Sequence, residues 1–283
     1  MKCLHIITPV KDSIESTMDT IKAVLASNLN VPHTYTIYND FSTPENTARL
    51  EQASKEMGFR LVNLADLTDH PSPNYLLVLQ TARREALEAE AGLCIVESDV
   101  TVRPDTLQGL YDGATERTDC GIAASVTVDE AGDINYPYLY AKGMENQVVD
   151  NRKHQSFCCS LLTPELMRRF DFGLLNPEKN WYDVTISHEA LAAGLHNYLF
   201  TTLPVVHRPH QSRPWKQLKY KNPLKYYWLK YTRWIKSKLC PSHLSLHTLP
   251  CPTPPRSCCI LISPRWSLSC ARCRNAWKTA KGR

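Results

Sequence analysis

Hydrophobic positions in the first two hundred residues follow two spacings that alternate along the chain. Short apolar runs rich in β-branched and aromatic residues predict strands, and stretches with apolar residues every three or four positions predict helices. The expected strands are 3–7, 33–38, 59–64, 93–99, 121–126, 157–162, 198–200 and 205–207. The expected helices are 17–29, 44–57, 74–91, 105–114 and 183–193, with a further one that begins at Pro164. This alternation predicts an α/β fold with a doubly wound, mostly parallel sheet.

Two carboxylates, Glu97 and Asp99, close the apolar strand that begins at Leu93. Side chains alternate along a strand, so we expect both carboxylates on one face. Ligands bind at the carboxyl ends of strands in open α/β sheets. Carboxylates placed there can hold Mg²⁺ or Mn²⁺, with phosphate oxygens as further ligands. The pattern therefore favours a metal site, and a polar turn is the alternative.

Further polar segments fall where the expected elements begin or end. They are Ile6–Val10, Asn39–Ser42, Trp181–Val184 and Val206–His207. Together with Glu97–Asp99, and in this order, they resemble the motifs of the family 2 glycosyltransferases over residues 3–210. The resemblance implies a GT-A fold, which is a Rossmann-like, doubly wound, mostly parallel sheet.

The first two motifs concern the donor nucleotide. The resemblance implies that Thr8 and Pro9 lie at the turn toward the nucleotide and that Asp40 accepts a hydrogen bond from its base. Asn39 stands where the family more often has aspartate. Asp40 could instead make an Asx turn after its strand, as Asp and Asn often do.

The later motifs concern the metal and the acceptor. The resemblance implies that Asp99 and Glu97 bind Mn²⁺ or Mg²⁺, with Glu97 in place of the family's first aspartate, and that His207 closes the site as a further candidate metal ligand. Asp183 falls on the catalytic base, which would take a proton from the acceptor hydroxyl. The alternatives are a helix N-cap for Asp183 and a packed or solvated side chain for His207.

The implied function is a metal-dependent, inverting glycosyltransferase of the hexosyl or a related class. It would move a sugar from a nucleoside diphosphate donor to a glycan or lipid-linked acceptor in cell-surface glycan or glycolipid synthesis. A sugar nucleotidyltransferase is one alternative, although the stretch 8–13 contains no glycine for a phosphate loop. The other alternative is a non-catalytic, nucleotide-sugar-binding scaffold. The absence of a G-x-G-x-x-G sequence disfavours a dehydrogenase.

Charge divides the chain sharply. All 28 acidic residues lie at or before Glu189 together with 16 Lys and Arg, whereas 17 Lys and Arg and no acid follow. The segment 213–238 interleaves nine of these basic residues with tryptophans and tyrosines. Its apolar residues from Leu224 to Ile235 recur at helical spacing, which predicts an amphipathic helix. We expect this helix to bind an anionic membrane surface rather than nucleic acid; docking onto its own domain is the alternative.

The remaining segments bear on location. The amino terminus has no export signal and the chain has no apolar run of 18 residues, so we expect a cytoplasmic protein at the inner face of the plasma membrane. The five cysteines before residue 200 are then expected to be reduced. Residues 239–283 hold six cysteines and six prolines without periodicity, which is typical of disorder.

We predict that deleting residues from Pro214 onward releases the protein from anionic liposomes. Each Lys or Arg near such a surface contributes about 1 kcal/mol before screening by salt. Flotation with anionic and neutral liposomes at low and high salt measures this binding. Deleting only 239–283 is the control and should leave it unchanged. Equal binding to both lipid types, or none to either, would favour docking onto the domain itself.

Overall fold

The computed structural model describes residues 1–178, 181–208 and 224–229. Chain contacts divide it into two units, Met1–Ser212 and Arg213–Arg283. Most of the basic aromatic segment 213–238 and the whole tail 239–283 lie outside the described residues; the part at 224–229 is helical. The unit Met1–Ser212 contains all the strands and six α-helices of the described residues.

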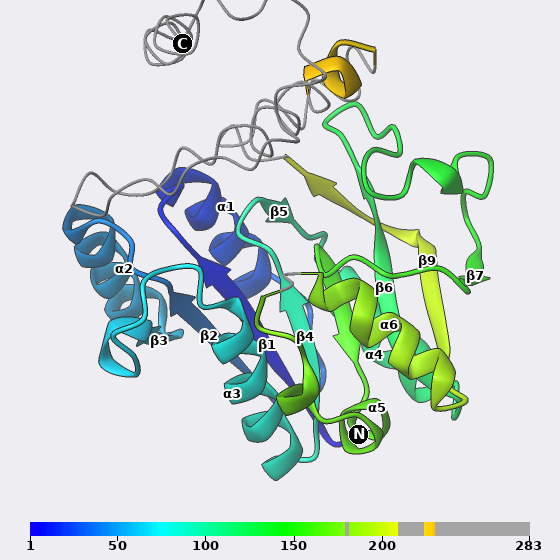
Figure 1. The fold of residues 1–283 in the computed structure, drawn as a ribbon, viewed down its shortest axis with the longest axis horizontal. Helices are drawn as coiled ribbons and strands as arrows, with labels where there is room; N and C mark the ends of the chain where they lie inside the picture. The colour runs from blue at the N-terminus through cyan, green and yellow to red at the C-terminus, as the bar shows by residue number, and fades with distance from the viewer. Residues whose placement is uncertain (179–180, 209–223, 230–283) are drawn as a thin grey trace, which may run out of the picture. The chain divides into compact units, whose positions relative to one another are not determined.

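A single twisted sheet forms the centre of this unit (Figure 1). Its order is β3-β2-β1-β4-β8-β6-β9-β5, and β7 also pairs with β9. The strands are β1 (Cys3–Val10), β2 (His33–Asn39), β3 (Arg60–Asn63), β4 (Ala91–Val96), β5 (Val100–Thr101), β6 (Cys120–Val128), β7 (Val148–Asp150), β8 (Cys159–Leu162) and β9 (His196–His207).

Strand direction changes at only a few places in this sheet. The pairs β3–β2, β2–β1, β1–β4 and β6–β9 are parallel. Strand β8 is antiparallel to both β4 and β6, so those two neighbours run in the same direction. The short strands β5 and β7 are antiparallel to β9. The expected doubly wound, mostly parallel sheet is confirmed.

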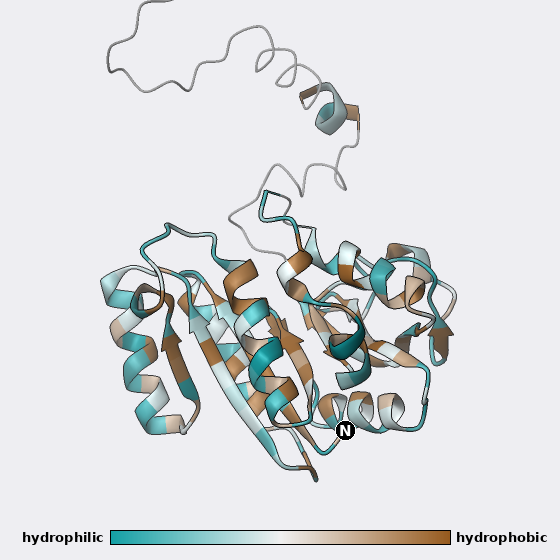
Figure 2. Ribbon diagram, turned by 60° about the horizontal axis from the view of Figure 1, so that its bottom comes forward, coloured by the Kyte–Doolittle hydropathy of each residue, from teal (hydrophilic) through white to brown (hydrophobic). Residues whose placement is uncertain are grey.

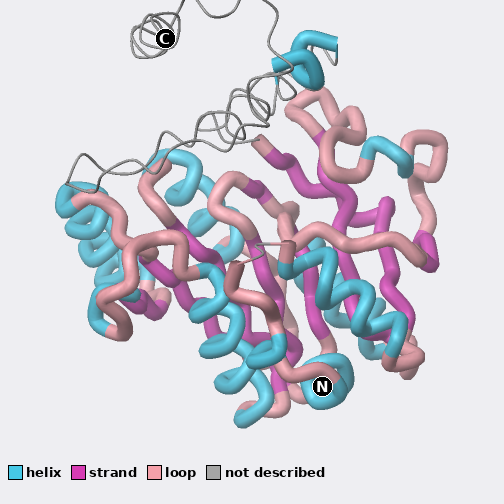
Figure 3. The backbone as a smooth tube through the Cα atoms, in the orientation of Figure 1, coloured by secondary structure: helices cyan, strands magenta, loops and turns pink. Residues whose placement is uncertain are grey.

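Helices cover both faces of the sheet (Figure 3). They are α1 (Ile14–Leu25), α2 (Pro44–Met57), α3 (Tyr75–Glu88), α4 (Thr106–Thr115), α5 (Pro164–Arg169) and α6 (Tyr182–Ala192). Helices α1, α2 and α4 share one apolar cluster with Cys94 and Val96 of β4. Helices α3, α5 and α6 share a second cluster with Leu93 and Ile95 of the same strand. Alternate residues of β4 therefore face opposite helical layers, and apolar residues concentrate on the strands between them (Figure 2).

Local sequence signals account for several boundaries. Helix α2 begins after Thr43, whose hydroxyl accepts a hydrogen bond from the Asn46 amide at 3.4 Å, and it ends at Gly58 with φ +80°. A positive φ costs glycine no steric penalty, so the helix ends there as the sequence predicts. Among the described residues, no helix is long and apolar enough to span a bilayer.

Two expectations need correction. The expected strands 198–200 and 205–207 are parts of one strand, β9, that runs past Pro204. Strand β4 ends at Val96, so Glu97 and Asp99 lie in the turn that leads to β5 rather than on a strand. Strand alternation therefore cannot orient the two carboxylates, and their surroundings have to do so.

Candidate functional site

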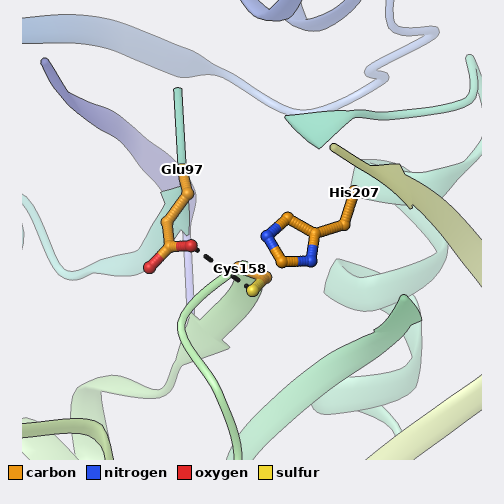
Figure 4. A group of neighbouring side chains, drawn as sticks. All are labelled: Glu97, Cys158 and His207. Atoms are coloured by element: carbon orange, nitrogen blue, oxygen red, sulfur yellow. Dashed lines mark hydrogen bonds between the residues drawn. The ribbon is translucent and has the colours of Figure 1, made fainter. Parts of the chain in front are cut away.

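The antiparallel pairing of β4 with β8 continues past the end of β4. Val96 lies opposite Cys159, and the Glu97 amide then donates to the Cys158 carbonyl at 2.9 Å. This pairing places the two side chains together, and the Cys158 thiol donates to Glu97 Oε2 at 3.4 Å (Figure 4). The Cys158 Sγ also lies 3.2 Å from the Ser156 hydroxyl. Cys158, 61 positions away in the chain, thus contacts the carboxylate of Glu97.

A second antiparallel pairing, β5 with β9, positions Asp99 beside His207. Val100 lies opposite His207, and the Arg208 amide donates to the Asp99 carbonyl at 2.9 Å. Both side chains are buried, and His207 Nε2 lies 3.6 Å from Asp99 Oδ2. His207 Nδ1 lies 3.1 Å from the Tyr136 carbonyl. Because a carbonyl can only accept, Nδ1 carries the hydrogen, and in the neutral ring the Nε2 lone pair faces the carboxylate.

These two pairings bring metal-ligating groups to one place at the carboxyl end of β4. One ligand atom each from Glu97, Cys158 and His207 lie within 4.8 Å of one another. Figure 4 shows the three side chains converging from separate elements. The structure therefore brings together Glu97, Asp99 and His207, which the sequence predicted, and adds Cys158, which it did not. A cysteine in an apolar run is typical of a small buried hydrophobe, so no sequence signal identified it.

Negative charge dominates this site. Burial and the charge of Asp99 raise the pKa of Glu97, although His207 opposes the shift. Burial lowers the pKa of His207, but its interaction with Asp99 and the charge of Glu97 outweigh this, so its pKa is raised overall. Burial, reinforced by the charge of Glu97, raises the pKa of the Cys158 thiol well above its usual value. All three shifts favour the protonated forms, as expected where negative charges are buried close together.

The ligand set suits a divalent transition-metal ion. Carboxylate, imidazole and thiolate are the groups that bind Zn²⁺ and related ions in proteins. Either a proton on Nε2 or a metal ion would provide the positive charge that the Asp99 carboxylate favours beside His207. The residues at the carboxyl end of β4 therefore fit a metal ion.

Asp183 lies in the first turn of α6 and faces the same region. Its charge contributes to the raised pKa values of Glu97, Tyr75 and Tyr138. The N-cap position belongs to Trp181, and Asp183 Oδ1 accepts a hydrogen bond from the Val184 amide at 2.9 Å. The alternative of an N-cap role for Asp183 is therefore wrong, because the residue is inside the helix. Its carboxylate is half-buried and adjoins the site.

Asp40, at the end of β2, holds the loop before α3. Its Oδ2 accepts from the Ser72 hydroxyl at 2.7 Å and the Asn74 amide at 2.9 Å, and its Oδ1 accepts from Asn74 Nδ2 at 2.8 Å. These bonds cross between distant segments, unlike those of a local Asx turn. The neighbouring Asn39 donates to Thr47 and Asn63, so its amide is used within the domain.

Thr8 and Pro9 occupy the last third of β1. The Thr8 side chain is fully buried, and its hydroxyl lies 3.0 Å from that of Tyr35 on β2. Pro9 is partly exposed and pairs in register with Tyr38. The backbone at Thr8 and Pro9, rather than the Thr8 side chain, is therefore what this strand presents toward its carboxyl end.

Two supporting residues escaped the sequence analysis. The buried Tyr138 hydroxyl accepts from the Ser156 amide at 2.9 Å and donates to the Ser156 carbonyl at 3.3 Å. The Tyr75 hydroxyl is buried and has no hydrogen-bond partner among the described residues. Tyr138 thus fixes the segment that leads to Cys158. Tyr138 comes from a segment without a regular pattern, and Tyr75 belongs to a helix whose periodicity gives its tyrosine no special role.

No protein-family model matches the sequence, and a comparison with curated proteins finds no match. Solved structures do resemble the fold. S. aureus TarS residues 1–349 match at 15% identity and a TM-score of 0.51, over 74% of this chain and 59% of that one. The mannosyltransferase PcManGT from Pyrobaculum calidifontis matches at 12% identity and a TM-score of 0.55, over 82% of this chain and 64% of that one. GalNAc-T7 matches at 10% identity and a TM-score of 0.54, over 73% of this chain and 44% of that one.

These neighbours show that the chain has a GT-A fold, as the sequence motifs predicted. The chain spans less than two thirds of the length of each of them. At 10–15% identity the likeness concerns the fold alone.

We predict that Tyr138→Phe lowers the free energy of unfolding by about 1–3 kcal/mol, because the buried Ser156 amide loses its hydrogen-bond partner. Urea denaturation measures the change. Tyr140→Phe is the matched control, since its partner Asn151 also donates to the His154 carbonyl. Equal losses in the two variants would contradict the role given to Tyr138.

Proposed function

We propose that this GT-A chain is a metal-dependent, inverting glycosyltransferase that moves a sugar from a nucleoside diphosphate donor to a hydroxyl acceptor. The observation that carries the proposal is the convergence of Glu97, Asp99 and His207 at the carboxyl end of β4, with Asp183 beside them. Ligand sites of open α/β sheets lie at this edge. The structural neighbours support the class of ligand that this site would bind.

The ligands of the structural neighbours support a sugar-nucleotide donor. PcManGT is described in complex with GDP-Man and Mn²⁺, TarS with UDP-GlcNAc, and GalNAc-T7 with UDP, GalNAc and Mn²⁺. These ligands share a nucleoside diphosphate, and two of the structures contain Mn²⁺. We extend that class of donor, and Mn²⁺ or Mg²⁺ as the ion, to this chain.

The metal-binding residues would act on the leaving group. Asp99, Glu97 and His207 would hold the ion, and the Tyr136 carbonyl would keep the His207 ring oriented through Nδ1. An ion held by these residues would supply positive charge to offset the charge that develops on the departing diphosphate. Burial of Asp99 strengthens its attraction for the cation, because little water screens it.

Asp40 would orient the donor base. A carboxylate has about four acceptor positions, and Ser72 and Asn74 occupy three of those of Asp40. One position stays available for an N–H of the base. The rigid hold of Ser72 and Asn74 would keep the carboxylate in place, while the backbone of Thr8 and Pro9 would line the same edge.

Asp183 would accept the proton of the acceptor hydroxyl. Direct attack from the face opposite the leaving diphosphate inverts the configuration at the anomeric carbon. A carboxylate is suited to this step because the hydroxyl loses its proton late, as it bonds to an oxocarbenium-like carbon.

The proposal extends to the location and the acceptor. Leu224, Tyr227 and Trp228 are 85%, 54% and 66% exposed, which supports a membrane-facing role for the helix that contains them. A peripheral position at the inner face of the plasma membrane would suit a lipid-linked acceptor and a role in cell-surface glycan synthesis. The liposome experiment above tests this part separately.

We predict that Asp99→Asn abolishes sugar transfer and removes the metal dependence of nucleoside diphosphate binding. The amide keeps the volume of the carboxylate but not its charge. Calorimetric titration of UDP and GDP with and without Mn²⁺ measures the effect. Glu97→Gln should weaken the same dependence less. Unchanged metal dependence in Asp99→Asn would remove Asp99 from the metal site.

We predict that Asp183→Asn lowers turnover by a factor on the order of 10² or more and leaves donor affinity nearly intact. Asparagine preserves the shape of the first turn of α6 but cannot take the proton. Transfer from a panel of sugar nucleotides, with donor binding measured in parallel, tests this. His188→Asn, on the exposed side of the same helix, is the control. Ordinary turnover in Asp183→Asn would exclude it as the base.

A further inference from the structure

We propose that Cys158 is a direct ligand of the metal ion together with Glu97, Asp99 and His207, and that its sulfur makes the site select a transition-metal ion over Mg²⁺. This inference deepens the proposed function. Only the role of the ion in sugar transfer rests on that proposal. The inference concerns a residue that no motif of the sequence indicated.

The distances between the ligand atoms fit one shared ion. Cys158 Sγ lies 3.4 Å from Glu97 Oε2, and His207 Nε2 lies 3.6 Å from Asp99 Oδ2. Ligands bound to Zn²⁺ at about 2.0–2.3 Å in a tetrahedron are about 3.3–3.7 Å from one another. The second distance is long for a hydrogen bond between nitrogen and oxygen. One ligand atom each from Glu97, Cys158 and His207 lie within 4.8 Å of one another, and Asp99 adjoins this group through His207.

Cys158 has two side-chain hydrogen-bond partners with which a bound cation would have to compete. The thiol is buried, and it contacts Glu97 Oε2 and the Ser156 hydroxyl. On metal binding the thiol proton would leave to solvent, and Ser156 would donate to the sulfur. Loss of that proton frees both the sulfur and the Glu97 oxygen to bind the ion.

An independent observation points to a ligand in the same place. The Tyr75 hydroxyl is buried without a hydrogen-bond partner among the described residues. It lies near enough to Glu97 and Cys158 for their charges to act on it. Buried hydroxyls in native proteins are nearly always hydrogen-bonded. A water or phosphate oxygen bound to the metal would supply the missing partner.

The chemistry of sulfur determines the selectivity. Mg²⁺ requires hard oxygen ligands in an octahedron and loses its water reluctantly. Thiolate and imidazole bind Zn²⁺ and Co²⁺ far better. A site with one thiolate, one imidazole and two carboxylates should therefore prefer these ions, and replacing the sulfur by oxygen should move the preference toward Mg²⁺.

Titration of the full-length protein with Co²⁺ tests the assignment without any donor. A cobalt–thiolate bond gives a charge-transfer absorption in the near ultraviolet. We expect this band in the wild type, and we expect Cys158→Ser to lose it and to bind Co²⁺ and Zn²⁺ at least about 10-fold more weakly. Mg²⁺ affinity should be unchanged. Cys159→Ser is the matched control, because that thiol is equally buried but lies near Ser125 and Cys94.

A second arm separates the six cysteines of residues 239–283 from those of the domain. A full-length variant with these six replaced by serine should keep the cobalt–thiolate band. Absence of the band there, or Co²⁺ affinity in Cys158→Ser equal to that of the wild type, would overturn the assignment. This arm does not depend on the stability of the Cys158 variant.

The outcomes also separate this inference from the proposed function. Metal-dependent donor binding without a cobalt–thiolate band would leave the glycosyltransferase proposal standing and exclude Cys158 as a ligand. A cobalt–thiolate band that depends on Cys158, without binding of any sugar nucleotide, would support the ligand and refute the donor.

Discussion

The repulsion between two carboxylates, held one residue apart where water is largely excluded, is the constraint on which this site depends. Asp99 is 4% exposed, and its charge raises the pKa of Glu97. A protein can keep such a pair only if protons or a cation compensate the charge. His207 and Cys158 supply groups that share a cation, so the electrostatic cost becomes affinity for a positively charged ligand.

Backbone pairing maintains this arrangement. The bonds from the Glu97 amide to Cys158 and from the Arg208 amide to Asp99 extend two antiparallel ladders into the turn between β4 and β5. Each ladder fixes one residue of the turn against a partner far away in sequence. The turn is thereby rigid although it is not a strand. Rigid donors bind an ion with little reorganisation, which favours affinity and geometric selectivity.

The helical layers bring the other groups to the same edge. Helix α3 begins at the loop that Asp40 holds, and Tyr75 in its first turn faces the carboxylates. Helix α6 places Asp183 on the same side. Both helices pack into one apolar cluster against β4. Packing of these helices thus links the donor, metal and acceptor parts of the site to one strand.

The sequence alone determined the order of the helices and the longer strands, because their apolar periodicities are local and strong, although the short strands β5 and β7 escaped it. Its polar segments predicted Glu97, Asp99, His207 and Asp183. It could not indicate the antiparallel direction of β8, since an apolar run reads the same in either direction. Only the tertiary structure decided that Cys158 lies beside Glu97 and that the Thr8 side chain is buried against Tyr35. Those contacts depend on pairing between segments far apart in the chain, and no spacing within a single segment encodes them.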